Sequence, residues 1–314
     1  MARPVVIQVA PGRWPGGATR FAGVIGDPVR HSLSPALHNA AYAALGLDWA
    51  YGAFPVAPWQ VDDAVAGAAA LGFVGLSVTM PHKEAVLRRA DQVTPVVRQL
   101  GAANTLRFER GQVAAASTDG EGLVADLRAA GFEPSGATTV VLGAGGAARA
   151  AILALAGAGA RQVVVVNRTE DRAQAAVALA GDAGVLAGAE AIGDAALVVK
   201  ATPVGMPLGA PAGDRPGGGP SSAPAADAGA SLGGRCRPGQ LVVDLVYHPP
   251  RTPFLEAAAA AGATVRNGLG MLVHQAALQV AWWTGEAPPL DALWAAVGEA
   301  ASPVGSAIPP SDRR

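Results

Sequence analysis

Two residues of opposite charge, Lys83 and Asp119, stand where the sequence changes from a strand pattern to a helix pattern. The first change lies in "GLSVTMPHKEAVLRRA", residues 75–90, which starts as a buried strand and continues after Met80-Pro81 with the composition of a helix. Because proline is favoured in the first turn of a helix, this pattern predicts that Lys83 lies in that turn. The helix dipole disfavours a cation there, so we expect Lys83 to serve chemistry.

Asp119 opens the second helix pattern, in "STDGEGLVADL". Thr118 and Glu121 have the spacing of a capping box, which leaves Asp119 without a structural task. If the strands before Lys83 and Asp119 are neighbours in one sheet, the two side chains meet at its edge. A lysine–aspartate pair in that position can hold and relay a proton.

A dinucleotide-binding pattern occupies residues 140–150, "VVLGAGGAARA". It follows a strand pattern and opens a helix, and Gly143, Gly145 and Ala148 match the fingerprint G-x-G-x-x-G/A. The first glycine permits a tight turn, the second lets a pyrophosphate approach the backbone, and the third small residue permits close packing of helix on strand. A plain glycine-rich turn is the alternative, because such turns are common.

The end of the next strand pattern, "VVVVNRTEDRA", indicates which dinucleotide is bound. An acidic residue at this place binds the ribose of NAD, whereas an arginine accommodates the 2′-phosphate of NADP. The sequence has Asn167 and Arg168 here, with Arg172 one helical turn later, which favours NADP. Two solvated arginines at the start of a helix are the alternative.

Two serines stand before the helix pattern in "GDPVRHSLSPALHNAAY", residues 26–42. Ser34 precedes Pro35 and is predicted to be a helix N-cap, a role that explains it without any ligand. Ser32 has no such role, and two hydroxyls beside a helix N-terminus would suit a carboxylate.

Near the C-terminus, one face of the helix predicted at 268–284 combines Leu272, Gln275, Ala276 and Gln279. For Gln275, a buried amide with satisfied hydrogen bonds and an amide that faces a ligand fit this spacing equally well.

The elements that must position these residues alternate between strand and helix, as in an α/β protein. Strand patterns are expected at 21–26, 49–56, 72–79, 104–117 (a hairpin turning at Arg110-Gly111), 195–203 and 239–247, and helix patterns at 34–45, 58–70, 119–130, 268–284 and 289–300. The segment 138–180 predicts the order strand, glycine-rich turn, helix, strand, turn, helix. The nearly continuous Val/Leu strands after residue 138 predict a parallel sheet covered on both faces. Residues 209–234 are almost entirely Gly, Ala, Pro, Ser and Asp, which predicts a flexible insert within that sheet domain.

Composition narrows the class of protein. The 314 residues are 51% hydrophobic with a net charge of −1, so the chain is long enough for one large domain or two ordinary ones, and a nucleic-acid partner is not expected. No apolar run has the length of a membrane span, the N-terminus does not read as a signal peptide, and the single cysteine suits a reducing cytoplasm. The histidines lack ligand spacing, so we expect no metal.

Taken together, these motifs resemble those of the shikimate dehydrogenase family over residues 21–300. The matching segments are "SLSP" (32–35), "SVTMPHK" (77–83), "GAANT" (101–105), "STDG" (117–120), "GAGGAARA" (143–150), "NRTEDRA" (167–173), "ATPVGM" (201–206), "DLVYHPPRTPFL" (244–255) and "GLGMLVHQAA" (268–277). The resemblance implies NADP-linked interconversion of 3-dehydroshikimate and shikimate by a cytoplasmic enzyme. It also implies an N-terminal α/β substrate domain (1–120, completed by helices at 268–301) and a Rossmann-type doubly wound NADP-binding domain (121–267).

The resemblance assigns roles to residues by match to the family's motifs. The implied catalytic pair is Lys83 and Asp119, with Lys83 supplying the proton to the oxygen at C3. The implied substrate-binding residues are Ser32, Ser34, Ser77, Thr79, Asn104, Tyr247 and Gln275. The implied coenzyme-binding residues are Gly143, Ala144, Gly145, Gly146, Ala147, Asn167, Arg168, Thr169, Arg172, Thr202, Gly268 and Met271.

The sequence departs from the family pattern at Ser77 and Lys200, where asparagine is usual. Ser77 leaves a quinate or aminoshikimate dehydrogenase as the alternative within the family. A non-catalytic NADP-binding sensor is the alternative outside enzymes, and the presence of both Lys83 and Asp119 argues against it. The expected partner is a small-molecule substrate, with no nucleic acid or membrane, and a homodimer is compatible with the sequence.

Overall fold

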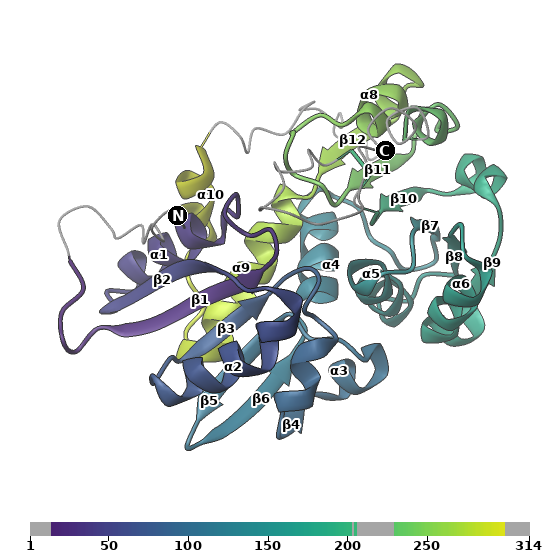
Figure 1. The fold of residues 1–314 in the computed structure, drawn as a ribbon. Coiled ribbons are helices and arrows are strands. Elements are labelled where there is room, and N and C mark those ends of the chain that lie inside the picture. Colours follow the sequence, from purple (N-terminus) through teal and green to yellow (C-terminus); the bar gives the residue numbers. More distant parts are fainter. Residues whose placement is uncertain (1–13, 203, 206–228, 299–314) are drawn as a thin grey trace, which may run out of the picture.

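The computed structural model describes residues 14–202, 204–205 and 229–298. Two six-stranded sheets, each with helices on both faces, lie beside one another, and the chain crosses from the first to the second and back (Figure 1). The expected α/β class with two domains is confirmed.

The first sheet has the strand order β2-β1-β3-β5-β6-β4. Its strands are β1 (Arg20–Gly26), β2 (Trp49–Pro55), β3 (Gly75–Val78), β4 (Gln92–Val93), β5 (Thr105–Glu109) and β6 (Gln112–Ala116). β5 runs antiparallel to both β3 and β6, so these two strands run the same way and end at one edge. The condition that the two strands are neighbours is not met, because the hairpin places β5 between them, but they still share an edge.

Helices from both ends of the chain cover this sheet. Helices α1 (Ser34–Ala44), α9 (Leu269–Thr284) and α10 (Leu290–Val297) pack on one face, while α2 (Val61–Ala70) and α3 (Pro95–Leu100) pack on the other. The Trp283 indole donates to the Leu106 carbonyl at 3.0 Å. A Cβ at Gly75 would lie 2.3 Å from the same indole nitrogen, so this close approach requires glycine.

The second sheet is parallel throughout, in the order β12-β11-β10-β7-β8-β9. Its strands are β7 (Thr138–Leu142), β8 (Gln162–Val166), β9 (Gly184–Leu186), β10 (Leu197–Lys200), β11 (Leu241–Asp244) and β12 (Thr264–Asn267). This is the doubly wound order of dinucleotide-binding folds, in which ligands bind at the carboxyl ends where the winding reverses. That point lies between β7 and β10.

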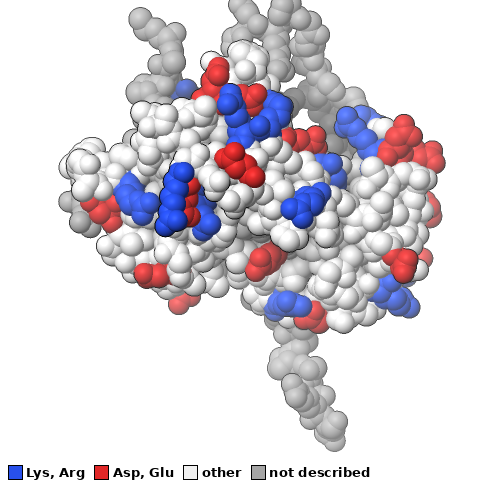
Figure 2. Space-filling model, turned by 90° about the horizontal axis from the view of Figure 1, so that it is seen from below, with Lys and Arg blue, Asp and Glu red and all other residues white. Residues whose placement is uncertain are grey.

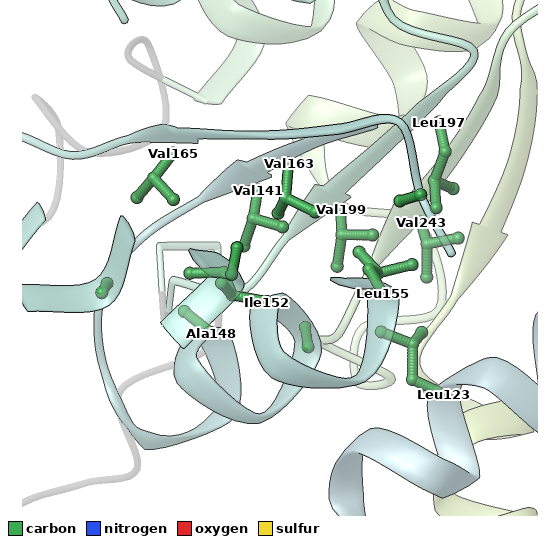
Figure 3. Packing of buried hydrophobic residues seen from close by; sticks show 14 of the residues in the cluster. Leu123, Val141, Ala148, Ile152, Leu155, Val163, Val165, Leu197, Val199 and Val243 are labelled. Carbon is green, nitrogen blue, oxygen red and sulfur yellow. The ribbon is translucent and has the colours of Figure 1, made fainter. Parts of the chain in front are cut away.

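Apolar side chains fill both faces of the second sheet, as its Val-rich strands predict. Helices α4 (Asp119–Ala129), α5 (Gly146–Gly157) and α6 (Glu170–Val177) cover one face and α8 (Pro253–Ala260) covers the other. Figure 3 shows Val141 and Val163 of the sheet packed against Ile152 and Leu155 of α5. Short 3₁₀ helices lie at Pro58–Gln60, Ala85–Arg89, Ala178–Ala183 and Ala189–Asp194.

The segment after β3 differs from its predicted helix. Pro81 lies in a turn that the His82 amide closes by donating to the Thr79 carbonyl at 3.0 Å, and helical backbone begins only at Ala85. The buried His82 ring holds this turn through a 2.7 Å hydrogen bond to a carbonyl of the β2–α2 connection. Lys83 is therefore not in a helical turn, and the argument from the helix dipole does not apply to it.

The insert predicted at 209–234 lies partly outside the described residues. Its last part is described and is helical at residues 229–233. A Cβ at Gly233 would lie 2.3 Å from the Phe254 carbonyl, so this turn packs tightly on α8 and is not a flexible linker.

Basic and acidic side chains are interspersed over the face seen from below, with residues of other types between them (Figure 2). Among the described helices, none combines the length and the apolar composition that crossing a bilayer requires.

Candidate active site

A cavity of about 170 Å³ opens at the sheet edge where β3 and β6 end. It is lined by all nine residues assigned to catalysis or substrate binding, together with Ala147, Gly268 and Met271 from the coenzyme-binding set. Residues from both sheets and from α9 therefore meet around one space. The remaining lining residues are Val24, Val78, Leu245, Leu272 and Gln279.

Lys83 and Asp119 form an ion pair at the edge of this cavity. The Lys83 ammonium donates to Asp119 Oδ2 at 2.5 Å, and the two side chains are 17% and 9% exposed. Lys83 reaches the cavity from the turn after β3, whereas Asp119 is the first residue of α4. The lysine is thus held by a carboxylate while it still faces the open space.

Asn104 fixes the other oxygen of this carboxylate. Its side-chain amide donates to Asp119 Oδ1 at 2.8 Å, and its own oxygen accepts from the Thr118 backbone amide at 2.9 Å. The Thr118 hydroxyl accepts from Asn104 at 3.0 Å and makes no helix cap, so the predicted capping box is wrong. The Thr118 hydroxyl, which the local pattern assigns to the helix cap, is instead bonded to the side-chain amide of Asn104, 14 positions earlier in the sequence.

The two serines exchange the roles that the sequence predicts. The Ser32 hydroxyl accepts from the Ser34 backbone amide at 3.2 Å, while Ser34 is the first residue of α1 and makes no cap. Ser34 is buried and lines the cavity, so it is the serine that capping does not explain. Burial raises the pKa of the nearby Tyr247 hydroxyl, and hydrogen bonds to the Leu33 backbone and the Ser32 side chain partly oppose this shift.

Gln275 joins the cavity to the crossing of α4 and α9. Its oxygen accepts from Asn104 at 3.2 Å and its nitrogen donates to the Leu272 carbonyl at 3.1 Å. A Cβ at Gly122 would lie 2.8 Å from the Gln275 backbone nitrogen, so only glycine allows α4 to approach this closely. The two interpretations left open by the sequence both apply, since the amide is bonded and faces the cavity.

The glycine-rich turn lies beside the catalytic pair. Gly143 has φ 121°, and a Cβ there would lie 3.1 Å from the methyl group of Thr202, so the turn after β7 meets the loop after β10. A Cβ at Gly146 would be 3.6 Å from Lys83 Cδ. At Gly145 the same atom would meet nothing within 4 Å, which leaves room for a ligand at the start of α5. The open side of the glycine-rich turn therefore lies next to Lys83, at the start of a helix, where a ligand phosphate can be bound.

The predicted phosphate-binding residues follow β8 at the same sheet edge. Arg168 and Arg172 are exposed, and the Asn167 side chain donates to the Thr169 carbonyl at 2.9 Å. Ala144 is half-buried against the core beneath the turn. Both arginines are therefore available to a ligand phosphate at this edge of the sheet.

Several polar residues around the cavity have no counterpart in the sequence-based assignments. Thr118, Tyr51 and Gln279 are buried and bonded to cavity residues. The sequence places Gln279 only on the same helix face as Gln275. Tyr51 carries no motif signal, since an aromatic residue in a strand is ordinary core.

Another buried pair lies under the coenzyme side. Lys200 and Asp244, at the ends of β10 and β11, are 1% and 0% exposed and lie 2.9 Å apart. Lys200 also donates to the Thr202 carbonyl at 3.2 Å, and the Thr252 hydroxyl donates to Asp244 at 2.6 Å. The pair therefore ties together two strands, the start of α8 and the loop that meets the glycine-rich turn.

His38, behind Ser34, gives a prediction about stability and pH. Burial lowers its pKa to about 4 from 6.5, and the hydrogen bond to the Ser34 backbone carbonyl offsets this only in part. Between these pH values the unfolded chain binds a proton that the folded chain does not, so the free energy of unfolding falls as the pH is lowered. Between pH 7 and 5.5, the free energy of unfolding of His38→Gln should therefore fall by about 1 kcal/mol less than that of the unmodified protein. Urea titrations of both proteins at the two pH values measure this, and equal losses would contradict it.

Comparison with known proteins places these features in a family. Three family models match along the chain: the shikimate dehydrogenase substrate binding domain at residues 24–106, shikimate / quinate 5-dehydrogenase at 126–202, and the shikimate 5'-dehydrogenase C-terminal domain at 268–297. The matched segments contain Lys83, Asn104, the glycine-rich turn and Gln275.

Individual relatives match over nearly the whole chain. A shikimate dehydrogenase (NADP(+)) from Methanopyrus kandleri is 46% identical over 90% of this chain and 96% of its own length. The crystal structure of shikimate 5-dehydrogenase from Thermus thermophilus in complex with NADP(H) and shikimate is 35% identical, with a TM-score of 0.76, and covers 90% of this chain and 99% of that chain. The ligand-free 5-ketofructose reductase of Gluconobacter sp. strain CHM43 is 30% identical, with a TM-score of 0.73 over 90% of this chain and 99% of that chain. On its family-model matches and its 46% identity to a full-length relative, this chain belongs to the shikimate dehydrogenase family.

Proposed function

We propose that the Lys83–Asp119 pair is the acid–base centre for the NADP-linked interconversion of 3-dehydroshikimate and shikimate. The observation that carries the proposal is the 2.5 Å ion pair, which faces a cavity that Ala147, just after the glycine-rich turn, also lines. The relatives named for this reaction, one of them solved with NADP(H) and shikimate, support the substrate and the coenzyme.

In this reaction the bound coenzyme supplies or accepts hydride at C3 of the substrate. During reduction, Lys83 donates a proton to the C3 oxygen as the carbonyl becomes a hydroxyl, and the lysine regains its proton from solvent. Asp119 stays hydrogen-bonded to Lys83 and Asn104, so it keeps the ammonium aimed at the cavity. The pair is already assembled at the edge of the cavity.

The other cavity residues bind and orient the substrate. Ser32 and Ser34, with Tyr247 beside them, hold the carboxylate at the start of α1. Thr79, Ser77, Asn104 and Gln275 surround the ring hydroxyls. The group at Gly143 to Ala147 with Asn167, Arg168, Thr169 and Arg172 holds the coenzyme phosphates and ribose, and Thr202, Gly268 and Met271 contact the nicotinamide.

A preference for NADPH over NADH is expected from Arg168 and Arg172. The guanidinium of Arg168 pairs with the 2′-phosphate, which NADH lacks, so Arg168→Gln should lower kcat/KM for NADPH by at least roughly tenfold and leave that for NADH nearly unchanged. Steady-state kinetics with both coenzymes measures this. Arg161→Gln, at the opposite end of β8, is the matched control and should change neither value. Equal use of the two coenzymes by the unmodified protein would contradict the assignment.

Turnover tests the reaction itself. The purified chain should oxidise NADPH in the presence of 3-dehydroshikimate, and should reduce NADP with shikimate. Quinate and 5-ketofructose are the comparison substrates, because the family models and the similar Gluconobacter structure include these activities. A higher kcat/KM for either of them than for the shikimate pair would assign the protein to that reaction instead.

The proposal extends to the arrangement of the chain. The substrate domain comprises residues 1–120 with the helices at 268–301, and the coenzyme domain comprises residues 121–267. A homodimer in the cytoplasm with no nucleic-acid or membrane partner completes the proposal. Sedimentation velocity of the purified chain tests its oligomeric state.

A further inference from the structure

The donor and the acceptor in each hydrogen bond of Gln279 can be assigned in only one way. Its amide nitrogen lies 3.2 Å from the Asn104 carbonyl, a group that can only accept. The nitrogen must therefore face that carbonyl, and the amide oxygen must face the opposite way, towards Ser77. The Gln279 side chain is 1% exposed, so water does not offer it an alternative partner.

This orientation determines what the Ser77 hydroxyl can do. Ser77 Oγ lies 2.7 Å from the Gln279 oxygen, and since that oxygen only accepts, the Ser77 hydrogen is committed to it. The Tyr51 hydroxyl, 2.6 Å from Ser77 Oγ, must then be the donor to Ser77. Burial raises the pKa of Tyr51, so its hydroxyl keeps the proton that this bond needs. One lone pair of Ser77 Oγ remains for a ligand.

The second hydrogen of the Gln279 amide orders the strand next to Ser77, where Thr105 is the register partner of Ser77. It goes to Thr105 Oγ1 at 2.9 Å, and Thr105 in turn donates to the Asn104 side-chain oxygen at 2.7 Å. That bond and the backbone amide of Thr118 both point the Asn104 nitrogen towards Asp119. A single buried amide thus orients polar groups on two adjacent strands, Ser77 on β3 and Asn104 with Thr105 at the start of β5.

We propose that Gln279 is a positioning residue that makes Ser77 a hydrogen-bond acceptor only, so that the substrate atom seated against Ser77 must be a donor, namely a ring hydroxyl. This inference rests on the proposed function, because it assumes that shikimate occupies the cavity. It deepens that function by stating which substrate group can lie against Ser77. A hydroxyl, which can donate a hydrogen bond, is favoured there, and a group with lone pairs but no hydrogen is disfavoured.

Fluorine is the probe, since it replaces a hydroxyl at similar size without a hydrogen to donate. We consider shikimate and its three analogues in which one ring hydroxyl is replaced by fluorine, with dissociation constants from calorimetry. For the position that faces Ser77, the fluoro analogue should bind the unmodified protein roughly tenfold or more weakly than shikimate. Ser77→Ala identifies this position as the one at which the penalty disappears.

Gln279→Met and Tyr51→Phe then separate the proposal from a merely structural role. Gln279→Met frees the Ser77 hydrogen to face the fluorine. In this variant the dissociation constants of the fluoro analogue and of shikimate should therefore differ by no more than about threefold. Tyr51→Phe is the matched control, because it removes a bond to the same hydroxyl but frees a lone pair and not a hydrogen, so the penalty should persist. A penalty unchanged by Gln279→Met, or lost equally in Tyr51→Phe, would overturn the proposal.

A measurement on the unmodified protein covers the case in which Gln279→Met does not fold. At the same ring position, the deoxy analogue should bind more tightly than the fluoro analogue, because an acceptor repels fluorine but not hydrogen. The reverse order would mean that Ser77 donates, and would refute the proposal. Failure of shikimate itself to bind would instead count against the proposed function.

Discussion

Replacement of Lys83 by alanine should lower kcat by roughly 10²–10⁴, the range for loss of a positioned acid–base group. The ammonium is the group that donates to Asp119 while it faces the cavity at 17% exposure, so its removal leaves the C3 oxygen without that proton donor. The substrate KM should change less, because Ser34 and Gln275 remain in place. Steady-state kinetics in both directions measures the effect, and unchanged coenzyme affinity shows that the variant is folded. A near-normal kcat would remove Lys83 from the mechanism.

Asp119→Asn tests whether the pair acts as one unit. The change keeps the shape of the side chain but removes the charge that holds the ammonium, so kcat should fall as well. When two groups act together, the double variant is little worse than the worse single variant. Losses that multiply across Lys83→Ala and Asp119→Asn would mean that the two residues contribute independently.

Lys200→Met should lower the free energy of unfolding by about 3–5 kcal/mol, the cost of leaving one charge of a buried pair without its partner. The remaining carboxyl of Asp244 is 0% exposed and would keep only the Thr252 hydroxyl and the Val246 amide. Burial already raises the pKa of Asp244. In the variant the folded state favours the protonated carboxyl more than the unfolded state does, so the deficit should shrink as the pH is lowered from about 8 to about 5.

Urea unfolding of Lys200→Met and of the double variant Lys200→Met/Asp244→Asn measures this deficit. The double variant should recover much of the lost stability, since it buries no unpaired charge. Surface pairs provide the contrast: Arg237→Met, which breaks an exposed pair with Asp194, should cost no more than about 1 kcal/mol. A similar cost for Lys200→Met and Arg237→Met would contradict the role given to burial.

Elements that depend mainly on local sequence were predicted correctly. The Val-rich strands from residue 138, the glycine-rich turn and the hairpin at Arg110-Gly111 all lie where they were expected, because each depends on local backbone preferences or on burial of both faces. The meeting of Lys83 with Asp119 was also predicted, although the reason for it was only half correct. Their strands share an edge without being neighbours.

Local rules failed where a distant residue competes for the same group. Thr118 has the spacing of a cap, but the Asn104 amide occupies its hydroxyl. The segment at Pro81 has the composition of a helix start, but the buried His82 ring holds it in a turn. The role of Gln279 could not be predicted at all, because its partners on the first sheet are more than 170 residues away in the chain.

The cover that α9 provides for the first sheet also concerns the order of synthesis. When the ribosome has completed residues 20–116, all six strands of that sheet exist, yet the face bearing Val24, Tyr51 and Val74 still lacks α9. The parallel sheet of the other domain is made entirely before residues 269–284 emerge. The part of this apolar face that α9 covers therefore stays open to chaperones or to other nascent chains until residues 269–284 have been made, although α1 is made soon after β1.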